Sequence, residues 1–280
     1  MNIYQERYLN TYMKDYKKKY LNLQDDIISD NLYIILKCNH LAGLFANYMA
    51  VVHALLMYEL KYIKGLDVQF GSNGMYGHDE KNWWDFYFQP IRLGKFDGIN
   101  CSKYSWSNLA QAGRINERIK LNEIIKKYIK LQPHIQKKID NFFEKYMHGK
   151  KIMGIHYRGT DKNNDVKVPS YDIFLNTVKE NISGYNCIYV ATDDANFLTV
   201  MKKEFGDMII ALDCTRSSDN IAIHLSKHKD RHEIGTAAIM DCYLLAKTHL
   251  LIKSTSNVSR VTLYINPSLP VIELSKLWGE

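Results

Sequence analysis

From residue 151 onward, short apolar segments alternate with longer segments of helical periodicity, and this alternation constrains the fold more than any other feature. The apolar segments "KIMGIHY", "NCIYVATDD", "DMIIALD" and "HLLIK" predict strands at 151–157, 186–194, 207–213 and 249–253. The periodic segments predict helices at 170–182, 195–206, 231–248 and 256–265. Because strands that alternate with helices form parallel sheets covered on both faces, we predict a doubly wound, Rossmann-like α/β fold here.

The first half of the chain carries a looser form of this pattern. The run "NLYIILKC" (31–38) is continuously apolar, which is typical of a strand buried on both faces. We predict a helix that ends at Gly65, a second strand at 66–70 and a long lysine-rich helical stretch from about 108 to 147. Strand, helix and strand in this order indicate a βαβ unit.

The two patterns meet near Gly149. A chain of 280 residues holds one large domain or two medium ones, at about 150 residues for each domain. We therefore predict two domains, at 1–149 and 150–280.

Composition and charge exclude several classes of protein. Apolar residues make up 46% of the chain and charged residues 24%, which is typical of a folded protein with a packed core. The net charge of +7 suits an anionic ligand or an anionic membrane surface. No basic stripe interleaves with aromatic residues, so we expect no nucleic-acid binding. Five cysteines without a CxxC pair do not indicate a disulfide framework and favour a reducing compartment.

We expect a cytoplasmic protein. The first thirty residues are polar and lack the apolar core of a signal peptide. The longest apolar run, "LFANYMAVVHALLMYEL", contains Asn47, His53 and Glu59, so it predicts a core helix and not a membrane span. The basic run "KDYKKKY" near the start is typical of a solvated helix face, and it also leaves open a peripheral association with the inner face of a membrane.

Polar clusters follow the predicted strands of the second half: "HYRGTDK", "TDD", "DCTRSSD" and "KSTSN". Ligands of open α/β sheets bind outside the carboxyl ends of the strands, so we expect these clusters to converge on one site. The planar fork of donors on Arg158 suits a diphosphate. The alternative is an ion pair with Asp161 that merely closes the turn.

The segment "KSTSNVSR" (253–260) joins a strand to a helix through small hydroxylated residues. Free amides at the start of a helix, together with hydroxyl groups, form an anion site. The alternative is ordinary N-capping by one of the hydroxyl side chains, Ser254, Thr255 or Ser256. Both can hold at once.

Three groups of titratable residues are candidates for a binding site. Asp241 shares a helix face with Ala238 and Leu245, and a buried carboxylate needs a partner, either within the protein or in a ligand such as the N1–H and N2–H₂ edge of a guanine. We expect Asp193 and Asp194 to cap a helix and to contact a ligand, and not to hold a metal. We interpret the regularly spaced histidines as part of a solvated loop and not as a zinc site; they are His224, His228 and His232.

Taken in order, "GIHYRGTDK", "IYVATDD" and "DCYLLAKTHLLIKSTSNVSR" resemble the three peptide motifs of the α1,6-fucosyltransferases. That family includes the core N-glycan enzyme, the bacterial nodulation enzymes and, more distantly, the protein O-fucosyltransferases. The resemblance implies a GT-B architecture, α/β with two Rossmann-like domains facing a cleft, in which the first domain binds the acceptor and the second binds the GDP-sugar. It also implies inverting transfer of fucose from GDP-fucose to a glycan acceptor, without a metal or a further cofactor.

The resemblance also implies a role for individual residues. Arg158 would grip the β-phosphate of GDP, and His156 and Asp241 would frame the guanine. Further donor-binding positions are Asp193, Asp194, Thr255, Ser256 and Asn257.

The catalytic base is implied to follow the arginine motif. Asp165 is the nearest acid, and Asp161 is the alternative, unless it orients Arg158 or Lys162. Relatives often carry a second arginine where this chain has Gly159, so one phosphate contact is missing or is supplied by Lys162.

Other functions stay open at this level. The short chain lacks the SH3 domain of the animal enzyme, which favours a bacterial enzyme of surface polysaccharide synthesis. The alternatives are a GT-B transferase that uses another nucleotide sugar and a non-catalytic nucleotide- or glycan-binding module. The aromatic segment at 82–91 would stack on an acceptor sugar or, as is more common, form core; its members are Trp83, Trp84, Tyr87 and Phe88.

Overall fold

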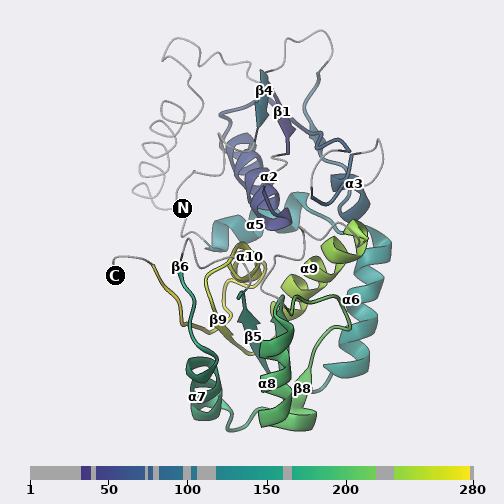
Figure 1. Ribbon diagram of the computed structural model, residues 1–280. Coiled ribbons are helices and arrows are strands. Elements are labelled where there is room, and N and C mark those ends of the chain that lie inside the picture. The colour runs from purple at the N-terminus through teal and green to yellow at the C-terminus, as the bar shows by residue number, and fades with distance from the viewer. Residues whose placement is uncertain are drawn as a thin grey trace, which may run out of the picture. The chain divides into compact units, whose positions relative to one another are not determined.

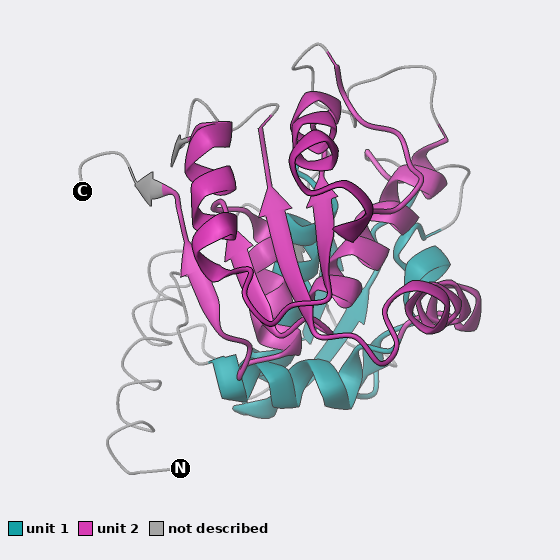
Figure 2. Cartoon of the chain, turned by 90° about the horizontal axis from the view of Figure 1, so that it is seen from below, with its two compact units in different colours: residues 1–74, 79–130 teal, residues 75–78, 131–280 magenta. Residues whose placement is uncertain are grey.

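The computed structural model describes residues 33–38, 42–72, 75–77, 82–96, 102–105, 118–159, 166–218 and 230–277. The chain forms two compact units (Figure 2). Unit 1 comprises residues 1–74 and 79–130, and unit 2 comprises residues 75–78 and 131–280. The units therefore divide at residue 130, whereas the sequence places a domain boundary near Gly149, and the helix between these positions belongs to unit 2.

Unit 2 is built on a five-stranded sheet of order β10-β9-β5-β7-β8, in which every pairing is parallel (Figure 1). The strands are β5 (Ile152–Tyr157), β7 (Cys187–Thr192), β8 (Ile209–Ile210), β9 (Leu250–Lys253) and β10 (Val271–Glu273). All residues of β5 and β7 are buried, as expected for the centre of a sheet covered on both faces. A separate antiparallel pair joins β6 (Val166–Lys167) to β11 (Lys276–Leu277).

Five helices belong to unit 2: α6 (Pro133–Tyr146), α7 (Tyr171–Asn181), α8 (Ala195–Phe205), α9 (Arg231–Leu245) and α10 (Asn257–Ile265). Local chemistry starts four of them. Pro133 occupies the first turn of α6, and side-chain oxygens of Asp194, Asp230 and Ser256 accept backbone N–H groups at the starts of α8, α9 and α10. The strands and helices predicted from residue 151 onward are thus confirmed, except in the third strand.

The third predicted strand is much shorter than expected. A 3-10 turn, η3 (Gly206–Met208), precedes it, and only Ile209 and Ile210 pair with β7. The residues from 211 to 216 have no regular structure. This part of the prediction was wrong because an apolar run does not show at which residue the hydrogen-bonded pairing with the neighbouring strand ends.

Unit 1 contains a four-stranded sheet of order β3-β2-β1-β4. Its strands are β1 (Tyr33–Lys37), β2 (Gly65–Val68), β3 (Arg92–Leu93) and β4 (Ser102–Ser105), and its helices are α2 (Leu44–Glu59), α3 (Trp84–Tyr87) and α5 (Arg118–Tyr128). The parallel pair of β1 with β2, joined by α2, confirms the predicted βαβ unit.

Three predictions for the first half were wrong in detail. Helix α2 ends at Glu59 because Lys61 adopts a left-handed backbone with φ of 63°, and Gly65 begins the next strand. Strand β1 is buried on alternate residues only. The long helical stretch is two helices separated before Pro133, and its first ten residues lie outside the described residues.

The aromatic segment at 82–91 is part of the hydrophobic core, as the second of its two interpretations predicted. Trp83, Trp84, Tyr87 and Phe88 are all buried. The rings of Trp84 and Phe88 stack with centroids 4.3 Å apart.

The basic run at residues 14–20 lies outside the described residues. In the part of the chain that the structure describes, no helix is both long and apolar enough to cross a bilayer.

Candidate functional site

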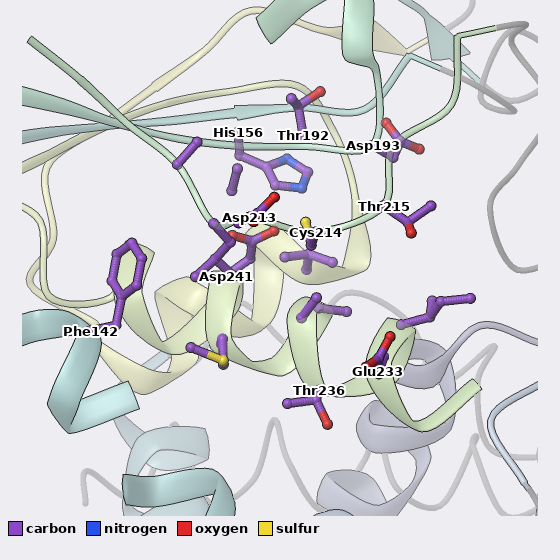
Figure 3. A pocket seen from close by; sticks show the side chains of 18 of the residues that line it. Phe142, His156, Thr192, Asp193, Asp213, Cys214, Thr215, Glu233, Thr236 and Asp241 are labelled. Atoms are coloured by element: carbon purple, nitrogen blue, oxygen red, sulfur yellow. The ribbon is translucent and has the colours of Figure 1, made fainter. Parts of the chain in front are cut away.

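The carboxyl ends of the strands of unit 2 border a cavity of about 870 Å³ (Figure 3). Its wall includes residues from three of the four predicted polar clusters, represented by Arg158, Asp193 and Cys214, and Val258, which directly follows the fourth cluster, also lines it. A volume of this size is typical of small-molecule sites. Three of the four clusters therefore meet at this cavity, and a contribution of the fourth cluster to the same site stays a prediction.

Arg158 ties three strand ends together. Its Nε lies 3.2 Å from Oδ2 of Asp193, and its backbone N–H donates to Oγ of Ser254 at 2.8 Å. The next residue, Gly159, donates its backbone N–H to Oδ1 of Asp193 at 3.3 Å. Asp161 lies outside the described residues, so its ion pair with Arg158 stays a prediction. Asp193, a partner that the structure shows, directly follows β7.

Gly159 leaves no room for a larger residue. A Cβ at this position would lie 2.5 Å from the ring of Tyr157 and 3.0 Å from Oδ2 of Asp194. A second arginine after Arg158 would therefore displace the buried Tyr157. Lys162, the predicted replacement, lies outside the described residues, as do Asp161 and Asp165.

The adjacent acids Asp193 and Asp194 have different tasks. Asp194 is buried, and its Oδ1 accepts the N–H groups of Asn196 and Phe197 at 2.8 and 3.1 Å. Its Oδ2 accepts the hydroxyl of Tyr171 at 2.6 Å. Asp194 is thus the predicted helix cap, while Asp193 lines the cavity. A direct ligand contact by Asp194 stays a prediction.

His156 is a neutral imidazole in the cavity wall. It is 5% exposed, its Nε2 lies 3.4 Å from Oγ of Ser256, and its Nδ1 makes no hydrogen bond to any described residue. Burial, with the charges of Lys253 and Arg158, lowers the pKa of His156 to about 3. The ring can therefore offer one donor or one acceptor to a ligand, and no charge.

The hydroxyl groups after β9 are largely engaged within the protein. Ser256 caps α10 by accepting the N–H of Ser259 at 3.2 Å. Thr255 donates its N–H to Oγ of Ser275 and its hydroxyl to Oε1 of Glu273, both at 2.8 Å. Asn257 is the first residue of α10. The predicted N-capping is therefore present, and the anion site at this helix start stays a prediction.

Asp241 is half-buried and points from α9 to the cavity (Figure 3). Its Oδ1 accepts the hydroxyl of the buried Tyr189 at 2.6 Å. Burial raises the pKa of Asp241 to about 7, although the Tyr189 hydrogen bond and the charge of Arg216 favour the ionised form. A partner within the protein thus holds one oxygen of a carboxylate that still lines the cavity.

Two parts of the wall were not predicted from the sequence. The first is a stripe on α6 with a spacing of four residues, formed by Lys138, Phe142 and Tyr146. The spacing was visible, but this helix lies before the predicted boundary and was assigned to the other domain. The second is the irregular loop after β8, which contributes Asp213, Cys214 and Thr215.

No zinc site was expected at the spaced histidines, and two of them, His224 and His228, lie outside the described residues. His232 lies at the start of α9, where its N–H donates to Asp230 at 2.8 Å. Within the described ranges, no group of three or more histidine, cysteine or acidic side chains has the arrangement of a metal site.

No family model and no curated protein matches the chain. The chain is similar to NodZ α1,6-fucosyltransferase co-crystallized with GDP, with a TM-score of 0.57 and 17% identity over 88% of this chain and 96% of that one. POFUT1 in complex with GDP has a TM-score of 0.56 and 11% identity, over 88% of this chain and 98% of that one.

A plant structure extends this likeness. A mutant of FUT1 from Arabidopsis thaliana in complex with GDP has a TM-score of 0.56 and 12% identity, over 98% of this chain and 79% of that one. Identities at this level establish the fold. The α/β prediction is confirmed, and the arrangement of two domains across a cleft stays a prediction. The chain has the GT-B fold of the fucosyltransferases.

Proposed function

We propose that this chain is a glycosyltransferase that binds GDP-fucose in the cavity of unit 2 and moves the fucose to a glycan acceptor. The observation that carries the proposal is Asp241, a carboxylate with one oxygen fixed by Tyr189, in the wall of a cavity at the ends of parallel strands. NodZ, a solved structure to which the chain is similar, is an α1,6-fucosyltransferase, and one NodZ structure was soaked with GDP-fucose.

The base belongs at the Asp241 end of the cavity. Carboxylate oxygens accept two parallel donors, which the guanine edge supplies and adenine lacks. The ring of Phe142 lies beside this end, with its centroid 6.0 Å from that of Tyr189. An aromatic ring next to a base-pairing carboxylate gives a purine both a stacking face and an edge to read.

The diphosphate belongs at the Arg158 end. The wall carries more carboxylates than cations, which makes most of it unfavourable for an anion; the acids are Asp193, Asp213, Asp230, Glu233 and Asp241, and the cations are Lys138, Arg158 and Lys202. Next to Arg158, the start of α10 adds backbone amides that favour negative charge. Ser256 and Asn257 are proposed to contact the phosphate here, and Thr255 to hold the backbone that presents them.

The reaction is a direct displacement at the anomeric carbon. The acceptor oxygen forms a bond to that carbon while the bond to the β-phosphate oxygen breaks, so the configuration inverts and GDP leaves with the electron pair. Arg158 and the α10 amides stabilise the charge that develops on the leaving diphosphate. The proton of the acceptor hydroxyl passes to an acid after the arginine motif, Asp165 or Asp161.

We propose that no metal takes part at the diphosphate. Asp193, the acid of this region that lines the cavity, is paired with Arg158, and both oxygens of Asp194 bind groups of the protein. Arg158 and Lys162 would supply the positive charge instead. A cytoplasmic bacterial enzyme that builds a surface polysaccharide is the biological setting that we propose.

Calorimetric titration tests the donor site. GDP, ADP and UDP are titrated without divalent metal into the wild type, into Arg158→Ala and into Lys179→Ala, a control that removes a cation paired with Glu204 away from the cavity. We expect selective GDP binding that weakens about 10- to 100-fold in Arg158→Ala only. Equal or absent binding of the three nucleotides would exclude the guanine assignment.

Turnover separates the remaining alternatives. A transferase releases GDP from GDP-fucose in the presence of acceptor glycans, whereas a non-catalytic binding module binds GDP-fucose and releases nothing. A transferase for another sugar would bind GDP, leave GDP-fucose intact and release GDP from a different GDP-sugar.

A further inference from the structure

Arg216 closes the irregular loop after β8 on itself. Its Nη2 donates to the backbone carbonyl of Leu212 at 2.8 Å, and its Nη1 donates to that of Cys214 at 3.3 Å. The side chain is half-buried, and its Nε is buried without a hydrogen bond to any described residue. A planar guanidinium that binds two carbonyl groups holds the loop more rigidly than a single hydrogen bond does.

This loop is a wall of the cavity. Leu212, Asp213, Cys214 and Thr215 line the cavity, and Figure 3 labels the last three on the loop near Asp241. Its far end is fixed to β7, because the N–H of Ser217 donates to the carbonyl of Asp193 at 2.8 Å. Between β8 and Ser217, the two bonds from Arg216 are the hydrogen bonds that we observe to the carbonyl groups of the loop.

The charge of Arg216 also reaches the carboxylate that is proposed to read the base. It stabilises ionised Asp241, and it acts in the same direction on Tyr189 and Cys214. We infer that Arg216 is a positioning residue for base recognition, which fixes the cavity loop and whose positive charge favours the ionised form of Asp241. The inference rests on the proposed function, since it assigns the selectivity of that same site.

The surroundings of Asp241 make this charge decisive. Burial and, to a smaller extent, the negative charge of Asp193 raise the pKa of Asp241 to about 7, and the Tyr189 hydrogen bond and the charge of Arg216 limit the rise. Other titratable groups that line the cavity are His156 from β5, Asp213 and Cys214 from the loop, Lys138 and Tyr146 from α6, and Glu233 from α9. Without Arg216, the pKa of Asp241 moves higher.

The sign of the effect on binding follows. Guanine needs the ionised carboxylate, so GDP affinity is high above the pKa of Asp241 and falls as the pH drops through it. Removal of the Arg216 charge shifts this midpoint to higher pH. A shift of one pH unit would lower the ionised fraction at pH 7 about five-fold, and GDP affinity with it.

The test compares neutral and charged replacements in the full chain. GDP affinity is measured by calorimetry between pH 6 and 9 for the wild type, Arg216→Gln and Arg216→Lys, with circular dichroism as the check on folding. We expect Arg216→Gln to shift the midpoint upward and, because it loses the clamp as well, to bind GDP at pH 9 about as tightly as Arg216→Lys does. Arg216→Lys keeps the charge but not the two-carbonyl clamp, so we expect weaker binding at every pH and an unshifted midpoint. Protonation of GDP itself is common to all variants and cancels.

Two further measurements keep the result decisive. Arg216→Met is the second neutral variant, used if Arg216→Gln does not fold. ADP serves as the ligand without a guanine edge, and we expect its binding to lack the shift. A midpoint in the neutral variants equal to that of the wild type overturns the inference alone. Absence of GDP binding by the wild type at every pH overturns the proposed function and the inference together.

Discussion

The two faces of the sheet in unit 2 are built from the same strands and differ sharply in chemistry. On one face, Met153, Ile155 and Tyr157 of β5 pack in an apolar cluster with α7 and α8. On the other face, Thr248 and Leu245 pack closely against Gly154, and His156 contributes a polar ring to the cavity wall. The period of two along a strand thus separates a stabilising face from a face that carries the cavity.

The apolar face is packed around aromatic rings. Phe197 of α8 stacks on Tyr157 with centroids 4.2 Å apart and meets Phe174 of α7 edge-on at 5.4 Å. The cavity face instead holds a tyrosine–carboxylate pair, Tyr189 with Asp241, and a neutral histidine. A buried carboxylate with a raised pKa costs stability, so the difference shows where the fold tolerates a cost for the sake of binding.

The largest effect should come from the apolar face. Phe197 is fully buried, and Phe197→Ala is expected to lower the free energy of unfolding by about 3–5 kcal/mol, because it leaves a cavity among packed rings. Urea unfolding measures this loss. Ile173→Ala on neighbouring α7 is the control, since Ile173 is 47% exposed and its truncation should change stability by less than about 0.5 kcal/mol. Similar losses in both variants would contradict the division between the faces.

The second prediction concerns a substitution in the cavity wall that leaves the apolar face of the sheet unchanged. Phe142→Ala removes the ring proposed to stack on the base and should weaken GDP binding by about 1–3 kcal/mol. Calorimetry with GDP measures the loss, and Phe142→Trp should retain the affinity.

The neighbouring phenylalanine on α6 is the matched control for this prediction. Phe143 lies against His148 and Lys247 and is absent from the cavity wall. Phe143→Ala should therefore leave GDP affinity unchanged. Equal affinity losses in Phe142→Ala and Phe143→Ala would show that α6 acts through stability and not through stacking.

The two faces of the sheet also differ in how well the sequence predicts their structure. Strands β5, β7 and β9 and helices α7 to α10 were predicted because their periodicities are strong and their starts carry caps such as Asp194 and Ser256. The GT-B fold followed from three motifs at the strand ends. These signals are local, and they survive in a single sequence.

The parts that were missed depend on tertiary placement. The α6 stripe with Phe142 joins the cavity wall only because the helix packs with unit 2, which no local pattern records. In the sequence, the loop closed by Arg216 resembles the continuation of an apolar strand. Its hydrogen bonds from Arg216 go to the backbone carbonyls of Leu212 and Cys214, and bonds to the backbone leave no mark in the residue types. Nor does a sequence show that Asp193, 35 residues further along the chain, pairs with Arg158.

The smallest predicted effect compares stability with binding at Asp241. The folded state raises the pKa of this group from 3.8 to about 7, so between these values the unfolded chain loses the proton first. Stability contributed by protonated Asp241 is therefore complete below pH 3.8 and is lost as the pH rises toward 7. Asp241→Asn has no such proton, so it should become more stable than the wild type by on the order of 1 kcal/mol at pH 8, since water in the cavity screens part of the cost.

Urea unfolding at several pH values between 5 and 8 measures this difference, and GDP titration of the same samples measures its consequence. Asp241→Asn should gain stability relative to the wild type as the pH rises and lose GDP affinity over the same range, because the amide offers guanine only one acceptor. A stability difference that is constant with pH would show that the cavity does not perturb this carboxylate. If Asp241→Asn gains stability and loses GDP affinity, the aspartate at this position favours binding and lowers the stability of the fold.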